Sequence, residues 1–270
     1  MQWYWIAVLS VFGLWFIYSL LTSFTMAHYS ARPKKFTDEE CNKREKDLIK
    51  FDSTNYDKLS RETFELNTDG ALIKGYIIYN EKKSDKVAVI VHGFTASVIS
   101  CAKYGEIFYN LGYNIVTFDQ RYFGQSTGDS CTMGYRESGD LLEVIEFIKT
   151  KFVNPKIVLH GESMGAATVL LALPKTDNSI IYAVADCSFS RCKKLYRYVT
   201  RRTTLFLKVV GVVELNGIDE DAAHADIILR ACTIQQREVP PVQGAHGGYK
   251  AYLQTLIPCI LHGLTNLIFC

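Results

Sequence analysis

Residues 156–173, KIVLHGESMGAATVLLAL, constrain the fold more than any other stretch of this chain. An apolar run, Ile157–Leu159, leads to His160-Gly161, and an Ala- and Leu-rich stretch follows Gly165. The pattern predicts a buried strand, a sharp turn and a helix, with Ser163 at the apex of Gly161-Glu162-Ser163-Met164-Gly165. Such a turn needs small residues on either side, because strand and helix nearly touch there. The free N–H groups at the start of the helix would face any negative charge that develops beside Ser163.

Strands and helices are predicted to alternate on both sides of this turn. A hairpin at 63–79 opens the folded part, since Asp69-Gly70 marks a tight turn. The predicted buried strands are Val87–Val91, Tyr113–Phe118 and Ile180–Ala185, and the predicted helices are Ser100–Asn110, Glu137–Phe152 and Ile218–Cys232. This order predicts an α/β fold with a mostly parallel central sheet and helices on both faces.

Polar residues follow the predicted strands at the edge of the sheet where chemistry is expected. His92-Gly93, Asp119, Ser163 and Asp186 each come at the carboxyl end of a strand. In parallel sheets these ends form a common edge, and ligands bind there. The sequence therefore predicts an active site that contains these positions.

The N-terminal residues form an apolar segment without charge before Arg32. Residues 3–26 are long enough to cross a bilayer, and residues 1–30 are predicted to be a transmembrane anchor. A cleaved signal peptide is the alternative, although a basic n-region is missing. Arg32, Lys34 and Lys35 follow the span, so the positive-inside rule places the domain on the cytoplasmic side. Residues 31–62 are interpreted as a juxtamembrane helix or tether, with a solvated connector favoured, and residues 63–270 as the folded domain.

Composition narrows the possible partners. The net charge of +2 gives no electrostatic case for a nucleic acid. The eight cysteines form no C-x-x-C pair, so no zinc or redox site is indicated, and mostly reduced thiols are expected, although the even count leaves disulfides open. No metal or other cofactor is expected.

Three motifs together resemble the α/β-hydrolase superfamily, in particular membrane-anchored serine hydrolases of the serine aminopeptidase and acyl-esterase branch. They are HGFTAS, FDQRYFGQS and HGESMGAA, each after a predicted strand. The resemblance implies that Ser163 is the nucleophile and that the backbone N–H groups of Phe94 and Met164 form an oxyanion hole. It also implies a buttressing role for His92, and Asp119 and Arg121 are interpreted as a structural pair.

The C-terminal part departs from the family at the acid and the base. The stretch from His262 ends in Asn266 where the family has aspartate, and neither a final strand and helix nor a histidine follows. The expected fold therefore lacks its last strand and helix. Residues 235–256 are interpreted as an atypical insertion, which contains His246 as the candidate base. Asp186 is the candidate acid, with a structural role as the alternative.

Two functions follow from these residues. The first is a serine hydrolase that cleaves an ester, thioester or short peptide through an acyl-enzyme on Ser163, with acyl transfer by the same serine as a variant. The alternative is a catalytically impaired α/β-hydrolase-like membrane protein with a binding role, or a truncated product. The expected partners are a small acyl or peptide substrate and the lipid bilayer.

Overall fold

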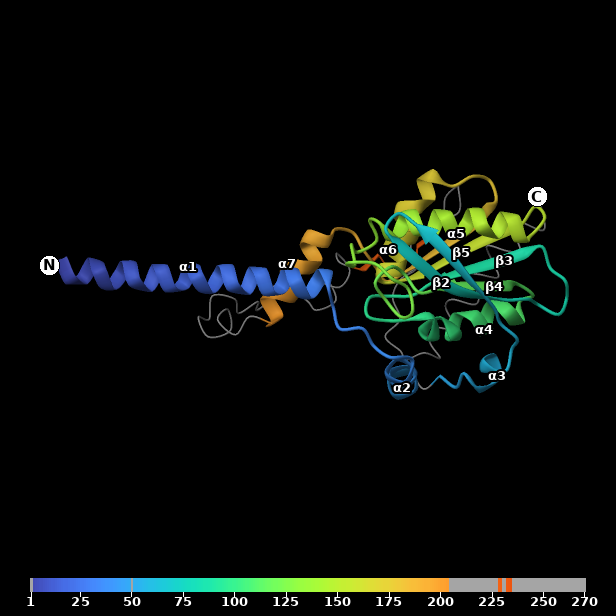
Figure 1. Cartoon of the computed structure of the whole chain (residues 1–270), viewed down its shortest axis with the longest axis horizontal. Coiled ribbons are helices and arrows are strands. Elements are labelled where there is room, and N and C mark those ends of the chain that lie inside the picture. Colours follow the sequence, from blue (N-terminus) through green and yellow to red (C-terminus); the bar gives the residue numbers. More distant parts are fainter. Residues whose placement is uncertain (1, 50, 204–227, 230–231, 235–270) are drawn as a thin grey trace. The chain divides into compact units, whose positions relative to one another are not determined.

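The fold is described from a computed structural model that covers residues 2–49, 51–203, 228–229 and 232–234. The chain divides into two compact units, residues 1–34 and residues 35–270. Figure 1 labels the helices and strands.

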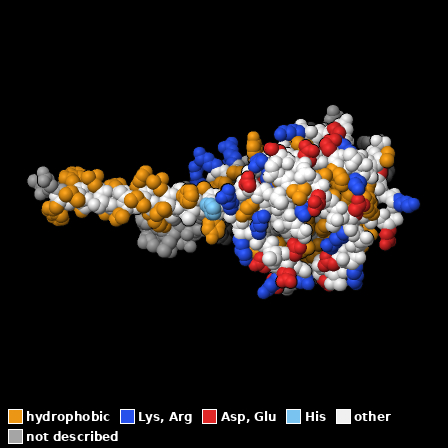
Figure 2. Space-filling view, in the orientation of Figure 1, with side chains coloured by type: hydrophobic (Ala, Val, Ile, Leu, Met, Phe, Trp, Pro, Cys, Tyr) orange, Lys and Arg blue, Asp and Glu red, His pale blue; other side chains and the backbone are white. Residues whose placement is uncertain are grey.

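The first unit consists of one long helix, α1 (Gln2–Ala31). Most of its large apolar side chains, such as Trp3, Leu9 and Phe24, are exposed, and Figure 2 shows apolar side chains along the visible face of the helix. Within the described residues, Trp3–Ala31 is the one helix long and apolar enough to span a membrane, and a signal sequence would share these properties.

The second unit is built on a seven-stranded mixed sheet with the order β1-β2-β4-β3-β5-β6-β9. The strands are β1 (Glu62–Thr68), β2 (Ala71–Ile78), β3 (Lys86–Val91), β4 (Asn114–Phe118), β5 (Lys156–Glu162), β6 (Ile180–Asp186) and β9 (Cys232–Ile234). The central strands β4, β3, β5 and β6 are mutually parallel, whereas the β1–β2 hairpin and β9 pair antiparallel at the two edges. The predicted hairpin and the predicted parallel strands are confirmed.

Helices cover both faces of this sheet, as Figure 1 shows. On one face, α5 (Glu137–Lys151) and α6 (Met164–Ala172) pack on side chains such as Val89 and Leu159. On the other face, α4 (Ala102–Asn110) follows the short helix η1 (Val98–Cys101) and packs on Ile90 and Val158. Neighbouring strand residues thus point to opposite faces and bury both, which explains the continuous apolar runs of β3 and β5. The short helix η2 (Leu173–Lys175) follows α6.

Residues 31–62, interpreted as a juxtamembrane helix or tether, are partly helical. The second unit already begins at Lys35, and the segment forms α2 (Asp38–Ile49) and α3 (Thr54–Asp57). Cys41 and Tyr56 are each only 1% exposed, because the few apolar residues of this polar stretch fall on the side that packs on the domain.

The prediction of one helix over Ile218–Cys232 is wrong where the structure describes it. Ile228–Leu229 forms the strand β8, which pairs with β7 (Ser188–Phe189), and Cys232 begins β9. Pairing of Ala183–Ala185 of β6 with β9 uses backbone groups that a helix here would leave at the sheet edge. The remaining helix, α7 (Cys192–Thr203), follows β7. The interpreted insertion at 235–256 and the residues from 257 to 270 lie outside the described residues.

Candidate active site

Ser163 occupies a strained turn between strand β5 and helix α6. Its backbone has φ 53° and ψ −108°, a region that residues with a side chain rarely adopt. Two backbone hydrogen bonds hold it there: its N–H donates to the carbonyl of Asp186 (2.7 Å), and its carbonyl accepts from the N–H of Ala167 (3.1 Å). The side chain is half-buried, so the hydroxyl group is presented at the carboxyl edge of the sheet.

Two glycines make this turn possible because the backbone packs too closely for a Cβ atom. A Cβ at Gly161 would overlap the carbonyl of Gly165, across the turn. A Cβ at Gly165 would overlap the carbonyl oxygen of Val91 and lie 2.6 Å from that of His92. The small residues predicted on either side of Ser163 are therefore needed for direct contact between α6, β5 and the end of β3.

The loop after β3 approaches Ser163 closely. A Cβ at Gly93 would lie 3.4 Å from the carbonyl oxygen of Glu162 and 3.6 Å from the Cβ of Ser163. Phe94 follows in this loop, and Met164 is the first residue of α6; both belong to one apolar cluster. The structure thus brings together the two residues whose N–H groups were predicted to form an oxyanion hole, and the helix dipole of α6 adds positive potential on the side of Met164.

His92 holds this loop through both ring nitrogens. Its Nε2 accepts the N–H of Gln120 (2.9 Å), so its Nδ1 carries the proton and donates to the carbonyl of Gly93 (2.7 Å). Burial lowers the pKa of His92 to about 4, which keeps the ring neutral. The Gln120 side chain donates in turn to the His92 carbonyl (2.6 Å) and accepts from the Thr168 hydroxyl (2.8 Å). These contacts fit a buttress and leave neither ring nitrogen for proton transfer.

Asp119 and Arg121 order the neighbouring loop, but they do so separately and not as the predicted pair. The Asp119 carboxylate accepts the backbone N–H groups of Val98 and Gln125, each at 2.8 Å. Burial raises the pKa of Asp119 to about 6 in spite of these bonds. Arg121 instead forms a two-pronged ion pair with Asp140 of α5, with both N–O distances at 2.6 Å.

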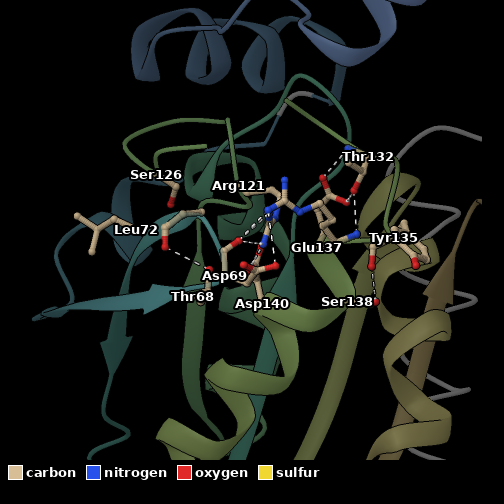
Figure 3. A network of polar contacts seen from close by, with 12 residues as sticks. Thr68, Asp69, Leu72, Arg121, Ser126, Thr132, Tyr135, Glu137, Ser138 and Asp140 are labelled. Carbon is tan, nitrogen blue, oxygen red and sulfur yellow. Dashed lines mark hydrogen bonds and ion pairs between the residues drawn. The ribbon is translucent and has the colours of Figure 1, made fainter. Parts of the chain in front are cut away.

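Figure 3 shows this second network. Arg121 also donates to the backbone carbonyl of Asp69 in the hairpin turn (3.2 Å), and Glu137 accepts the Thr132 hydroxyl group. The sequence does not reveal Asp140 as the partner of Arg121, because Asp140 lies on the first turn of a helix. Acidic residues are common at that position, since they interact favourably with the helix dipole, so Asp140 does not stand out.

Asp186 lies directly behind the serine turn. Its carboxylate is 4% exposed and accepts the Tyr104 hydroxyl and the Cys187 thiol, each at 3.1 Å. The ring of Tyr104 stacks on that of His160, with ring centroids 4.0 Å apart. Burial lowers the pKa of His160 to about 4, so His160 is a neutral ring beneath the turn. Asp186 is thus close to Ser163 through the backbone, while its side chain already has protein partners.

A buried cation next to the turn escaped the sequence analysis. Lys103 of α4 is 4% exposed and forms ion pairs with Glu162 (3.0 Å) and with Glu45 of α2 (3.2 Å). Burial alone would lower the pKa of Lys103, but the two carboxylates raise it above its usual value, so the amine stays charged. A lysine in an amphipathic helix gives no sign of burial until its partners are known.

His246, the candidate base, lies outside the described residues. In the part of the chain that the structure describes, no cluster of three or more His, Cys, Asp or Glu side chains could hold a metal ion. The five described cysteines are all free thiols: Cys41, Cys101, Cys131, Cys187 and Cys192.

Comparison with known proteins agrees with this geometry. Residues 87–201 match the family described as the alpha/beta hydrolase fold. The uncharacterised protein YqkD of Bacillus subtilis is 34% identical over 160 residues, which are 58% of this chain and 52% of that protein. The chain thus spans about half the length of this relative. The esterase Pf2001 of Pyrococcus furiosus superposes with a TM-score of 0.51 at 23% identity, over 68% of this chain and 72% of that one. The chain has the α/β-hydrolase fold.

We predict that Gly165→Ala destabilises the domain, because the new methyl group would overlap the backbone at the end of β3. Overpacking of a rigid backbone contact costs about 1–3 kcal/mol of unfolding free energy. Gly139→Ala is the matched control, since a Cβ there meets nothing within 4 Å and Ala favours the helix by roughly 1 kcal/mol. Urea unfolding of the full chain in detergent measures both, and equal midpoints for Gly165→Ala and wild type would contradict the contact.

A second prediction concerns acid stability. The folded state keeps His160 neutral down to a pH of about 4, whereas the unfolded chain protonates it near its ordinary 6.5. This difference stabilises the fold fully above pH 6.5 and is lost as the pH falls towards 4, by about 3 kcal/mol. The raised pKa of Asp119 has the opposite effect on the free energy of unfolding. Asp119 stabilises the fold at low pH, and this stabilisation is lost as the pH rises through about 6.

His160→Leu isolates the histidine contribution, since the two variants share every other group. We expect the urea midpoint of the wild type to fall more steeply between pH 6.5 and 4.5 than that of His160→Leu. Parallel pH profiles would show that His160 is not kept neutral by the fold.

Proposed function

We propose that the chain is a serine hydrolase that cleaves an ester, a thioester or a short peptide through an acyl-enzyme on Ser163. The observation that carries the proposal is the backbone of Ser163, which is held at φ 53° between a strand and a helix with Gly93 against it. A strained, partly exposed serine at the carboxyl edge of the sheet is the arrangement that nucleophilic catalysis needs.

In the proposed reaction, the Ser163 hydroxyl oxygen attacks the substrate carbonyl while a histidine takes the hydroxyl proton. The N–H groups of Phe94 and Met164 donate to the oxyanion that forms. The histidine then gives its proton to the leaving group, and water breaks down the acyl-enzyme by the same steps. His246 is the proposed base and Asp186 the proposed acid that orients it.

The side chains around the proposed oxyanion hole favour an apolar acyl group. Met164 packs in a cluster with the buried Phe123, Cys131 and Met133. Partly buried apolar side chains complete this cluster: Phe94, Tyr122, Phe189, Cys192, Leu195 and Tyr196. An acyl chain placed against them would lose contact with water, which favours binding by about 25 cal/mol for each Å² of apolar surface buried.

The alternative function is that of a catalytically impaired α/β-hydrolase-like protein with a binding role. One observation favours it: the two buried histidines near the turn are not available as bases. His92 uses both ring nitrogens in the loop, and His160 is fully buried beneath Tyr104. Neither of these two histidines can therefore act as the base for Ser163.

We further propose that α1 anchors the chain in a bilayer. Its exposed apolar side chains and the absence of charge before Arg32 support this role. Arg32, Lys34 and Lys35 follow the helix, so the proposed orientation places the domain on the cytoplasmic side.

The hydrolase proposal predicts covalent labelling of Ser163 by a fluorophosphonate probe. The full chain in detergent should label, and Ser163→Ala should lose all labelling while it keeps the wild-type unfolding midpoint. Ser179→Ala, which changes a serine in the turn before β6, is the matched control and should label as the wild type does. A folded wild-type chain without Ser163-dependent labelling would reject the proposal in favour of the binding role.

His246→Ala distinguishes the proposed base within the same experiment. Labelling should fall by at least about a hundredfold, because an unactivated serine hydroxyl is a poor nucleophile. Unchanged labelling of the folded variant would exclude His246 as the base and leave the role of Ser163 intact.

The anchor proposal predicts that the full chain stays in the membrane pellet after extraction with alkaline carbonate. A chain that lacks residues 2–31 should appear in the supernatant, because the apolar helix is the part that contacts lipid. Release of the full chain by carbonate, or cleavage after residue 31 in cells, would support a signal peptide instead.

A further inference from the structure

A buried ion-pair chain connects helix α2 with the residue that precedes Ser163. The amine of Lys103 contacts both carboxylate oxygens of Glu162, at 3.2 and 3.0 Å, and the Glu45 carboxylate at 3.2 Å. The Lys103 side chain is 4% exposed and that of Glu45 is 10% exposed, so little water reaches the ion pair between them. Three side chains from α2, α4 and the end of β5 therefore meet around one cation.

Helix α2 also contacts the loop that carries Phe94. Asp38, its first residue, accepts the Ser97 hydroxyl at 3.4 Å, and Cys41 is buried where α2 packs on η1. The start of α2 is fixed by reciprocal bonds: the N–H of Thr37 donates to the Glu40 carboxylate, and the N–H of Glu40 to the Thr37 hydroxyl. Helix α2 thus contacts the loop that carries Phe94 directly, and it is linked to the serine turn through Lys103.

These contacts restrict the serine turn because of where Glu162 lies. Glu162 is joined directly to Ser163, whose φ of 53° persists only if its neighbours are held in place. Rotation of the Glu162 backbone would pull its carboxylate from Lys103 and leave this buried cation with one of its two carboxylate partners, which is unfavourable. The pairing with Glu45 keeps Lys103 itself in position.

We propose that Glu45 and Lys103 are positioning residues for Ser163, and that α2 holds the nucleophile turn in its reactive geometry through them. The predicted effects on reaction rate rest on the proposed function of Ser163 as the nucleophile. It gives the segment that follows α1 in the chain a role in catalysis: the reactivity of Ser163 depends on whether α2 is docked.

The test compares the rate of Ser163 labelling by a fluorophosphonate in wild type, Glu45→Gln, Lys103→Met and Lys103→Arg. The maximal labelling rate should fall by about tenfold or more in Lys103→Met, because small displacements of a nucleophile from its oxyanion donors have effects of this size. The probe concentration for half-maximal rate should stay the same, since the apolar cluster is unchanged. Lys103→Arg should restore most of the rate.

Glu45→Gln keeps the shape of the side chain and removes only its charge, so it tests the role of α2 even if Lys103→Met fails to fold. We expect a fall of about threefold or more in the maximal labelling rate, and no further fall when Glu45→Gln is added to Lys103→Met, because both act through one contact. Lys149→Met is the matched control, since Lys149 also bridges two carboxylates, those of Glu146 and Asp177, but on α5 at the surface. It should label at the wild-type rate.

Hydrogen exchange provides a readout that does not depend on catalysis. Amides of residues 92–98 and 162–165 should exchange faster in Glu45→Gln than in wild type, whereas those of β4 should not. Wild-type labelling together with an unchanged rate in Glu45→Gln would overturn the positioning role and leave the proposed function intact. Absence of labelling in the wild type would reject the function itself, and unchanged exchange would then reject the role of α2 as well.

Discussion

The structure depends on the contact between the start of α6 and the end of β3. Gly165 lies against the carbonyl oxygens of Val91 and His92 so closely that a single methyl group would not fit. This contact fixes the angle at which α6 leaves β5, and with it the left-handed backbone of Ser163. Strain of this kind costs of order 1–3 kcal/mol and persists only where surrounding contacts enforce it. The sheet, the two glycines and the Asp186 carbonyl provide those contacts here.

Polar groups near the turn mostly hold backbone in place. His92 and Asp119 form hydrogen bonds with N–H and carbonyl groups of the loops after β3 and β4. Burial lowers the pKa of His92, which keeps the ring neutral, and raises the pKa of Asp119. Lys103 acts differently, because it joins two side chains, Glu45 of α2 and Glu162 before the turn, through ion pairs. The described core therefore contains the proposed nucleophile, Ser163, and two candidate oxyanion donors, while the proposed base, His246, lies outside the described residues. Because the proposed base lies outside the described residues, both an active hydrolase and a catalytically impaired relative are compatible with the described core.

The local sequence pattern predicts those parts of the fold that depend on residues close together in the chain. The turn at Ser163, the buried strands around it and the hairpin at Asp69-Gly70 all follow from apolar runs and from glycine. Contacts between distant segments could not be predicted in this way. The docking of α2 depends on a few apolar positions such as Cys41 in a mainly charged stretch, which resembles a solvated helix. The partner of Arg121 was missed for a similar reason, because Asp140 is 19 residues away and is one of several acids that could have served. The proposed roles of Asp186 and His246 remain predictions.

Acylation of Ser163 can be detected by mass spectrometry of the protein during turnover of an activated acyl ester. The full chain, mixed with p-nitrophenyl butyrate and quenched in acid within the first turnovers, should gain the mass of one butyryl group on the peptide that contains Ser163. Water should remove this group on longer incubation, and Ser163→Ala should never acquire it. If the Ser163 peptide of the folded wild-type chain stays unmodified, whether or not other residues react, Ser163 is not the nucleophile.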